Sequence, residues 1–278
     1  MALRMAAADL RARREAAGVS LAGAAQSLGV HQDTVRRMES AETALRHVYV
    51  ESLLRAYGTA EPDIKRVLEV LHEANKPGWW HEFRDVLPDH LQGTIDLESA
   101  ANMIRVYAPQ VLPELLQTPD YARAMLRLTH PREPAERTER RIELLAERKR
   151  RAFERPRPLR LWALIEESAL NRPVGGAQVM RAQRESLARM VADPMSPIAV
   201  QVVMPDGGPH PLLTSGPAEL MRFEHPALAD RAVVRGLHPE VTVHDGIDVV
   251  RTFQAAMDTV SIVARPPRTP LPPARGAW

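Results

Sequence analysis

The chain has 278 residues, of which 45% are apolar and 26% charged, as in a folded globular protein of one large domain or two smaller ones. It contains no cysteine, which excludes disulfides, thiol nucleophiles and thiolate metal sites, and its formal net charge of +2 is too small to indicate nucleic-acid binding by itself. No apolar run approaches the roughly 18 residues that span a bilayer, and the first residues lack a signal-peptide pattern, so we expect a cytoplasmic protein that does not act at a membrane.

The first 75 residues predict a domain of five short helices. The periodicity of apolar residues places these helices over residues 3–17, 21–28, 32–39, 48–57 and from Pro62 onward. Gly18, Gly29 and Gly58 each follow one of them, where a left-handed residue commonly ends a helix. Ser20 is placed to cap the second helix.

Residues 76–155 predict a helical middle segment. A break at Lys76-Pro77-Gly78 opens it, and the stretch 79–91 is irregular. Helices are expected over 97–107, from the Thr118-Pro119 start to about 128, and over 136–154.

Residues 156–264 predict a mixed α/β domain. Short runs of β-branched residues favour strands over 159–165, 198–204, 232–235 and 241–244, and helical spacing favours helices over 178–191 and 247–263. Five prolines among residues 265–278 predict a frayed or extended tail. We therefore expect an α+β protein that is mostly α.

Residues 20–39 carry the most specific functional signal, a helix–turn–helix unit. Two small alanines at 24 and 25 allow a close helix crossing, Gly29 suits the turn, and the apolar residues Val30, Val35 and Met38 would face a small core. This leaves polar side chains outward on the second helix, among them residues that read base edges or hold phosphates: Gln32, Thr34, Arg36 and Arg37. The alternative is a simple pair of packed helices with a solvated polar face.

This unit resembles the DNA-binding domain of Xre-type, or λ-repressor-like, regulators over residues 3–58. Later motifs are similar to the long C-terminal domain of a large actinomycete group of these regulators; they are residues 78–83, 95–98, 104–107, 115–123, 167–170, 172–175, 200–205 and 208–211. The resemblance implies a transcriptional regulator that binds DNA as a homodimer, with a small partner protein in an antitoxin-like arrangement. The C-terminal domain would sense a ligand, bind the partner or dimerise.

The chain departs from that family pattern in four places. Residues 21–23 are Leu-Ala-Gly where a polar residue usually opens the helix, His31 replaces a usual Ser or Thr cap, and residues 243–245 replace a usual Tyr-x-Glu. Asp33 adds negative charge near the proposed DNA surface. Residues 1–58 carry eight arginines against six acidic residues. This small positive surplus is too low for one domain to bind DNA tightly by itself.

Aromatic residues suggest a pocket for a small-molecule ligand. Trp79, Trp80 and Phe83, with Tyr107, could line its wall, because pockets favour aromatic side chains where elements meet. The alternative for the first three is a hydrophobic plug that joins two domains.

A rival hypothesis is a regulator scaffold recruited as an enzyme or small-molecule-binding protein, for instance in natural-product biosynthesis. Its candidate catalytic residues are Glu166 and Glu167, at a predicted strand end, and Tyr107. No nucleophile motif or phosphate loop accompanies them, so we assign no catalytic residue and no cofactor.

Two further sets of residues, the C-terminal histidines and a basic stretch, have simpler interpretations than ligand binding. His210, His225, His238 and His244 match no metal-binding spacing, so no metal site is expected. The stretch 137–160 has ten basic and four acidic residues, which could bind phosphate but is more simply a solvated helix with internal ion pairs.

Overall fold

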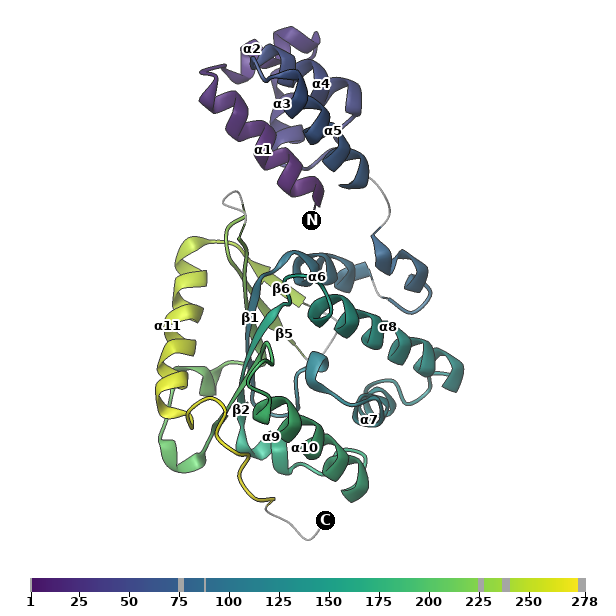
Figure 1. The fold of residues 1–278 in the computed structure, drawn as a ribbon, viewed down its shortest axis with the longest axis vertical. Coiled ribbons are helices and arrows are strands. Elements are labelled where there is room, and N and C mark those ends of the chain that lie inside the picture. Colours follow the sequence, from purple (N-terminus) through teal and green to yellow (C-terminus); the bar gives the residue numbers. More distant parts are fainter. Residues whose placement is uncertain (1, 75–77, 88, 225–227, 237–240, 275–278) are drawn as a thin grey trace. The chain divides into compact units, whose positions relative to one another are not determined.

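The computed structural model describes residues 2–74, 78–87, 89–224, 228–236 and 241–274. It divides into two compact units, the first made mainly of residues up to 81 and the second of most of the remainder (Figure 1). The predicted α+β class, with five N-terminal helices and a mixed C-terminal sheet, is confirmed. The predicted break at Lys76-Pro77, the histidines at 225 and 238, and the last four residues of the proline-rich tail lie outside the described residues.

The first unit consists of five helices at the predicted places. They are α1 (Ala2–Ala16), α2 (Leu21–Leu28), α3 (Gln32–Glu39), α4 (His47–Ala56) and α5 (Glu61–Ala74). Gly18 and Gly29 both adopt the left-handed conformation, with φ of +65° and +64°, so the chain turns sharply after α1 and α2. Apolar side chains from all five helices meet in one core.

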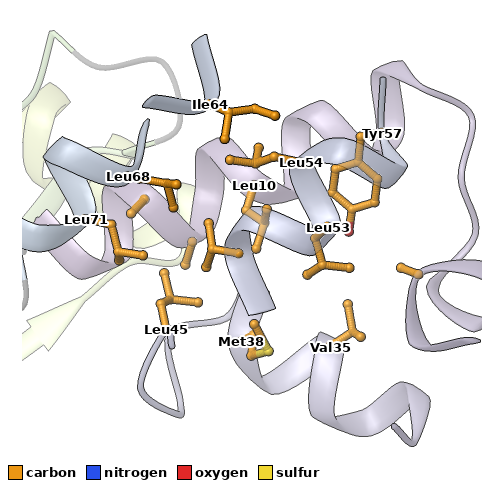
Figure 2. Close-up of a cluster of buried hydrophobic side chains, with 14 of the residues drawn as sticks. Leu10, Val35, Met38, Leu45, Leu53, Leu54, Tyr57, Ile64, Leu68 and Leu71 are labelled. Carbon is orange, nitrogen blue, oxygen red and sulfur yellow. The ribbon is translucent and has the colours of Figure 1, made fainter. Parts of the chain in front are cut away.

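Figure 2 shows that core, with side chains from the different helices directed toward one another. Leu10, Leu53 and Leu54 are fully buried near its centre. Burying each such side chain stabilises the fold by about 1.5–3 kcal/mol, which compensates for the short helices, since helices of 8–15 residues are marginal alone. Packing, rather than helix propensity, therefore holds this unit together.

The second unit is built on a six-stranded sheet. Its strands are β1 (Met103–Ala108), β2 (Arg160–Glu166), β3 (Ile198–Val203), β4 (Ala218–Arg222), β5 (Arg231–Arg235) and β6 (Val241–His244). They lie in the order β3-β2-β1-β4-β5-β6, with β1, β2 and β3 parallel and the β1–β4, β4–β5 and β5–β6 pairs antiparallel. β1 is therefore the strand where the parallel and antiparallel halves join.

Helices cover both faces of this sheet (Figure 1). One face carries α11 (Ile247–Val263), and the other carries α6 (Asp89–Ala100), α7 (Pro119–Thr129), α8 (Ala135–Phe153) and α10 (Ala177–Ala192). Shorter pieces are α9 (Glu167–Asn171) and the 3₁₀ turns η1 (Trp79–Phe83), η2 (Glu114–Leu116), η3 (Pro205–Gly207) and η4 (Pro211–Thr214). The described part of the tail, residues 265–274, contains no helix or strand.

The predicted helix over 97–107 is wrong. α6 ends at Ala100, and Met103–Ala108 forms β1 in the middle of the sheet. Residues 104–108 are all buried, because helices cover both faces of the strand, and such strands do not show the polar–apolar alternation of a half-exposed one. The middle segment is otherwise helical, in α6, α7 and α8.

β4 and α9 are further elements that the sequence did not reveal. β4 has the sequence Ala-Glu-Leu-Met-Arg, whose residues all favour helices when isolated. Its strand conformation comes from pairing with β1 on one side and β5 on the other. Tertiary pairing therefore overrides local propensity here.

Candidate nucleic-acid interface and ligand cavity

The turn between α2 and α3 has the geometry expected of a helix–turn–helix unit. The Ser20 hydroxyl caps α2 by accepting a hydrogen bond from the Gly23 amide at 3.1 Å. Ala24 and Ala25 are both buried, where a larger side chain would separate the two helices. Gly29, with φ of +64°, lets the chain leave α2 and enter α3 within three residues.

His31 performs the capping role that the sequence left open. Its Nδ1 accepts a hydrogen bond from the Asp33 amide at 3.3 Å, at the first turn of α3. An imidazole thus replaces the usual hydroxyl cap, and the start of α3 keeps a side-chain acceptor for one of its free amides.

α3 presents one apolar and one polar face. Val35 and Met38 are buried in the core of the first unit. The predicted DNA-reading residues lie on the same helix, with Gln32, Arg36 and Arg37 exposed and Thr34 half-buried. The structure therefore leaves three of the four side chains open to a ligand and gives the fourth partial access.

Acidic neighbours accompany both arginines of α3. Arg36 Nη2 lies 3.1 Å from Asp33 Oδ1, and Arg37 Nε lies 4.0 Å from an oxygen of Glu42. All four side chains are more than half exposed, and exposed ion pairs contribute about 0–1 kcal/mol. Such weak pairs can be exchanged for contacts with phosphate or a base.

A buried ion pair fixes the other end of α3. Arg14 of α1 donates hydrogen bonds from Nε and Nη2 to the two carboxylate oxygens of Glu39, at 2.8 and 3.0 Å, and its Nη1 donates to Val19 O at 2.9 Å. The hydrogen bond to Glu39 raises the pKa of Arg14, so the pair stays charged. Sequence reasoning missed this contact, because the two residues lie 25 positions apart and each reads as a surface charge.

A cavity of about 830 Å³ lies within the second unit, against the sheet face opposite α11. Its walls come from α6, the β1 strand, the chain around η2, α7 and α8, and it reaches the ends of β4, β5 and β6. Most of the lining side chains are aliphatic. A volume of this size is in the range of small-molecule sites.

Arg148 of α8 donates hydrogen bonds to two glutamates beside this cavity. Its guanidinium makes a two-point contact with Glu98 of α6, at 3.2 and 2.8 Å, and donates from Nη1 to Glu114 Oε2 at 2.5 Å. Arg148 and Glu98 are both buried, whereas the Glu114 side chain keeps 46% of its surface accessible and lines the cavity. α6, α8 and η2 are thus joined by one cation.

Arg235, at the end of β5, is, among the described residues, another of the three arginines that line the cavity, with Arg141 and Arg148. Its Nε donates to Glu219 Oε1 of β4 at 3.0 Å. Burial would raise the pKa of Glu114, but the positive charges of Arg148 and Arg235 outweigh burial and lower that pKa to about 2. The Glu114 carboxylate is therefore ionised throughout the physiological range.

The aromatic residues predicted to form a pocket are not brought together at this cavity. Tyr107 is among its lining residues, whereas Trp79, Trp80 and Phe83 are not. Phe83 is buried, and the guanidinium of Arg140 lies over its ring at 4.2 Å. Sequence reasoning also missed the cavity's charged residues, because their charges form no local motif. Glu114 and Arg235 stand among apolar neighbours, which was an available signal, whereas Arg148 lies within a charged run.

Two of the three candidate catalytic residues do meet, on the α11 side of the sheet. The Tyr107 hydroxyl donates to Glu166 Oε1 at 3.0 Å, and His210 Nε2 lies 2.9 Å from the same oxygen. Glu167 is buried and belongs to α9. Burial and the adjacent Glu166 charge raise the pKa of Tyr107, so its hydroxyl acts as a donor rather than a base.

This cluster is largely buried. The side chain of His210 is 1% exposed and that of Glu166 is 16% exposed, and Tyr107 is packed among buried apolar residues. A largely buried, hydrogen-bonded group of this kind fits a role in holding β1, β2 and η4 together.

Charged groups elsewhere act through ion pairs. On α8, Glu139 pairs with Arg123 at 2.6 Å, Glu143 with Arg140 at 2.8 Å, and Glu147 with its neighbouring arginines. Within the described residues, no cluster of three or more His, Asp or Glu could hold a metal ion, and no helix is long and apolar enough to cross a membrane.

Comparison with known families identifies both parts of the chain. Residues 6–67 match the family described as a helix-turn-helix domain, which covers α1 to α4 and part of α5. Residues 91–270 match the family described as a domain of unknown function (DUF5753), which covers the sheet and the cavity. A search of curated proteins and a search of solved structures each gave no match.

Proposed function

Because the chain belongs to the DUF5753 family and carries a helix-turn-helix domain, we propose that it is a sequence-specific DNA-binding transcriptional regulator of the Xre type. It acts as a homodimer in the cytoplasm, where its DNA target lies. Gln32, Thr34, Arg36 and Arg37 of α3 enter the major groove, and the second unit receives the signal that changes DNA binding.

The observation that carries this proposal is the way α3 is held. One face of the helix is locked into the core by Val35 and Met38, and its C-terminal end is fixed by the buried Arg14–Glu39 pair. The opposite face carries exposed Gln32, Arg36 and Arg37. A rigid helix with exposed amide and guanidinium groups is what direct base readout requires.

The charge balance of the first unit supports a dimer. Of its eight arginines within residues 1–58, Arg14 is buried against Glu39, and several others are paired with carboxylates on the surface. One such domain offers few free cations to phosphate, and two domains on adjacent half-sites double that number. We therefore expect a two-fold symmetric DNA site.

The second unit is proposed to sense a small molecule, since it contains a large cavity with charged groups in its wall. The resemblance to antitoxin-like regulators adds a small partner protein as a second proposed contact of this unit. The two proposals differ in where substitutions act, because a ligand needs the cavity and a partner needs the surface.

Selection from random DNA with the full-length protein tests the regulator proposal. The expected result is enrichment of a two-fold symmetric sequence, with half-sites about one helical turn apart and affinity that falls steeply as salt is raised. Light scattering of the same sample should give twice the mass of the 31.0 kDa chain. Failure to enrich any sequence would contradict the proposal.

A further inference from the structure

The cavity of the second unit has the size of a small-molecule site. Its volume of about 830 Å³ lies within the usual range of such sites. Charged side chains in its wall are held in fixed positions by hydrogen bonds. A cavity with such a wall is a candidate for ligand binding.

The wall indicates an aliphatic ligand body. Branched and flexible aliphatic side chains dominate it, among them Leu91, Ile95, Met125, Ile142 and Leu145. Tyr107 is a lining residue, but its ring packs in the core on the α11 side, where its hydroxyl donates to Glu166. A planar aromatic ligand would find no pair of rings to stack between, whereas an alkyl or alicyclic body would be well packed.

Two charged groups in the wall have hydrogen-bonding capacity to spare. Arg235 uses Nε for Glu219, and among the described residues its Nη1 and Nη2 have no hydrogen-bond partner. Glu114 uses Oε2 for Arg148, and within the same set its Oε1 accepts no hydrogen bond. The cavity therefore offers a strong donor and a strong acceptor to one ligand.

A third polar atom points to the same conclusion. Thr94 lines the cavity and is 3% exposed, and its hydroxyl oxygen is buried with no hydrogen-bond partner in the structure. A buried hydroxyl without a hydrogen-bond partner destabilises the structure. A ligand polar group can satisfy it.

The opposite charges of Arg235 and Glu114 select against a charged ligand. The wall also holds Arg141 and Arg148, which are paired with glutamates, and Glu219, which is paired with Arg235. An anion near Arg235 would be repelled by Glu219 and Glu114, and a cation near Glu114 would be repelled by Arg148 and Arg235. A neutral group that both donates and accepts, such as an amide or a hydroxyl, can satisfy both without being repelled by either.

We propose that this cavity binds a neutral, largely aliphatic small molecule whose hydroxyl or amide group donates to Glu114 and accepts from Arg235. The proposal deepens the sensing role in the proposed function and is independent of DNA recognition. Binding can be measured on the full chain without DNA, so failure of one proposal does not imply failure of the other.

Three probes with the same ten-carbon chain test the proposal: decanamide, decanoate and decylamine, each below its micelle concentration. Titration calorimetry on the full-length protein should show decanamide binding at least tenfold more tightly than either charged probe. Equal affinity for all three, or no binding of decanamide, would overturn the proposal.

Two charge-removing variants should change this preference in opposite directions. Glu114→Gln removes the repulsion of anions, so decanoate should bind at least fivefold more tightly than to the wild type; Arg235→Gln should do the same for decylamine. Glu136→Gln and Arg181→Gln, exposed on α8 and α10, are matched controls and should leave all three affinities unchanged. Cavity variants that behave like the controls would contradict the assignment.

A filling variant checks that binding occurs in the cavity itself. Ile142 lines it from α8 and is half-buried, so Ile142→Trp should fill part of the space and lower decanamide affinity at least tenfold. An unchanged melting temperature would show that the variant is folded. If the variant does not fold, the proposal is tested by the two charge variants, through the affinity of Glu114→Gln for decanoate and of Arg235→Gln for decylamine.

Discussion

The buried Arg14–Glu39 pair offers the sharpest test of how α3 is positioned. Glu39→Leu removes the carboxylate and leaves the Arg14 guanidinium in a site where its side chain is 10% exposed. Arg14 would keep its hydrogen bond from Nη1 to Val19 O and an ion pair at 3.6 Å with the exposed Glu15. The substitution thus tests whether charge pairing or apolar packing holds the end of α3.

The expected cost follows from burial. Glu39 is 4% exposed, and removing one partner of a buried pair typically destabilises a protein by about 3–5 kcal/mol, because the remaining charge loses its buried partner. The exposed Glu15 offsets part of this cost, so we expect the lower end of that range. A domain is stable by only about 5–15 kcal/mol in total, so this is a large fraction. In the double variant Arg14→Met/Glu39→Leu no charge is buried, and stability should return to within about 1 kcal/mol of the wild type.

Hydrogen exchange measured by mass spectrometry on peptides from residues 21–56 can localise the effect to the first unit. Glu39→Leu should speed exchange throughout α3, and the double variant should restore slow exchange. Glu51→Leu is the matched control, because Glu51 is 37% exposed and its pair with Arg55 should contribute less than about 1 kcal/mol. Equal effects of Glu39→Leu and Glu51→Leu would refute the reasoning.

Other substitutions test the turn, a buried amine and the surface of α3. Gly29→Ala should lower the free energy of unfolding of the first unit by about 1–2 kcal/mol in urea, because Gly29 has a φ of +64°. Gly93→Ala is the comparison: Gly93 lies inside α6 with open space around it, so alanine should stabilise the second unit by about 0.5–1 kcal/mol. Burial lowers the pKa of Lys149 to about 8, so the unfolded chain binds more protons between about pH 8 and 10.5 and stability should rise with pH across that window. Lys149→Met should abolish this rise and exposed Lys65→Met should not, as measured by melting temperature against pH. Asp33→Asn should increase DNA affinity a few-fold at low salt, since a carboxylate is removed beside a guanidinium; a decrease would show that the carboxylate contacts DNA productively.

The first unit shows what the sequence determines locally. Its helix bounds and turns follow from glycines, a serine cap and apolar spacing, each acting over a few residues. The sequence predicts that Val30, Val35 and Met38 face the core; Val35 and Met38 are buried there, and Val30 is half-buried against it. What the sequence did not reveal was the Arg14–Glu39 contact, because pairing over 25 residues leaves no local pattern.

The second unit shows where local reasoning fails. The residues of β1 predict a helix because a strand buried on both faces loses its alternation, and the residues of β4 predict no strand because they favour helices. The cavity depends on contacts among three separate segments, through Glu114, Arg148 and Arg235. Aromatic residues suggested a pocket, but the cavity is mainly aliphatic and includes only Tyr107 of the predicted set.

The central claim is that α3 reads DNA, and binding of the selected site by arginine variants tests it most directly. Fluorescence anisotropy at fixed salt should show that Arg36→Ala and Arg37→Ala each weaken specific binding by about 1–3 kcal/mol, roughly 5- to 150-fold, with unchanged melting temperatures. Arg181→Ala, which removes an exposed arginine from α10, should bind as the wild type does. Wild-type affinity in both α3 variants would contradict the account.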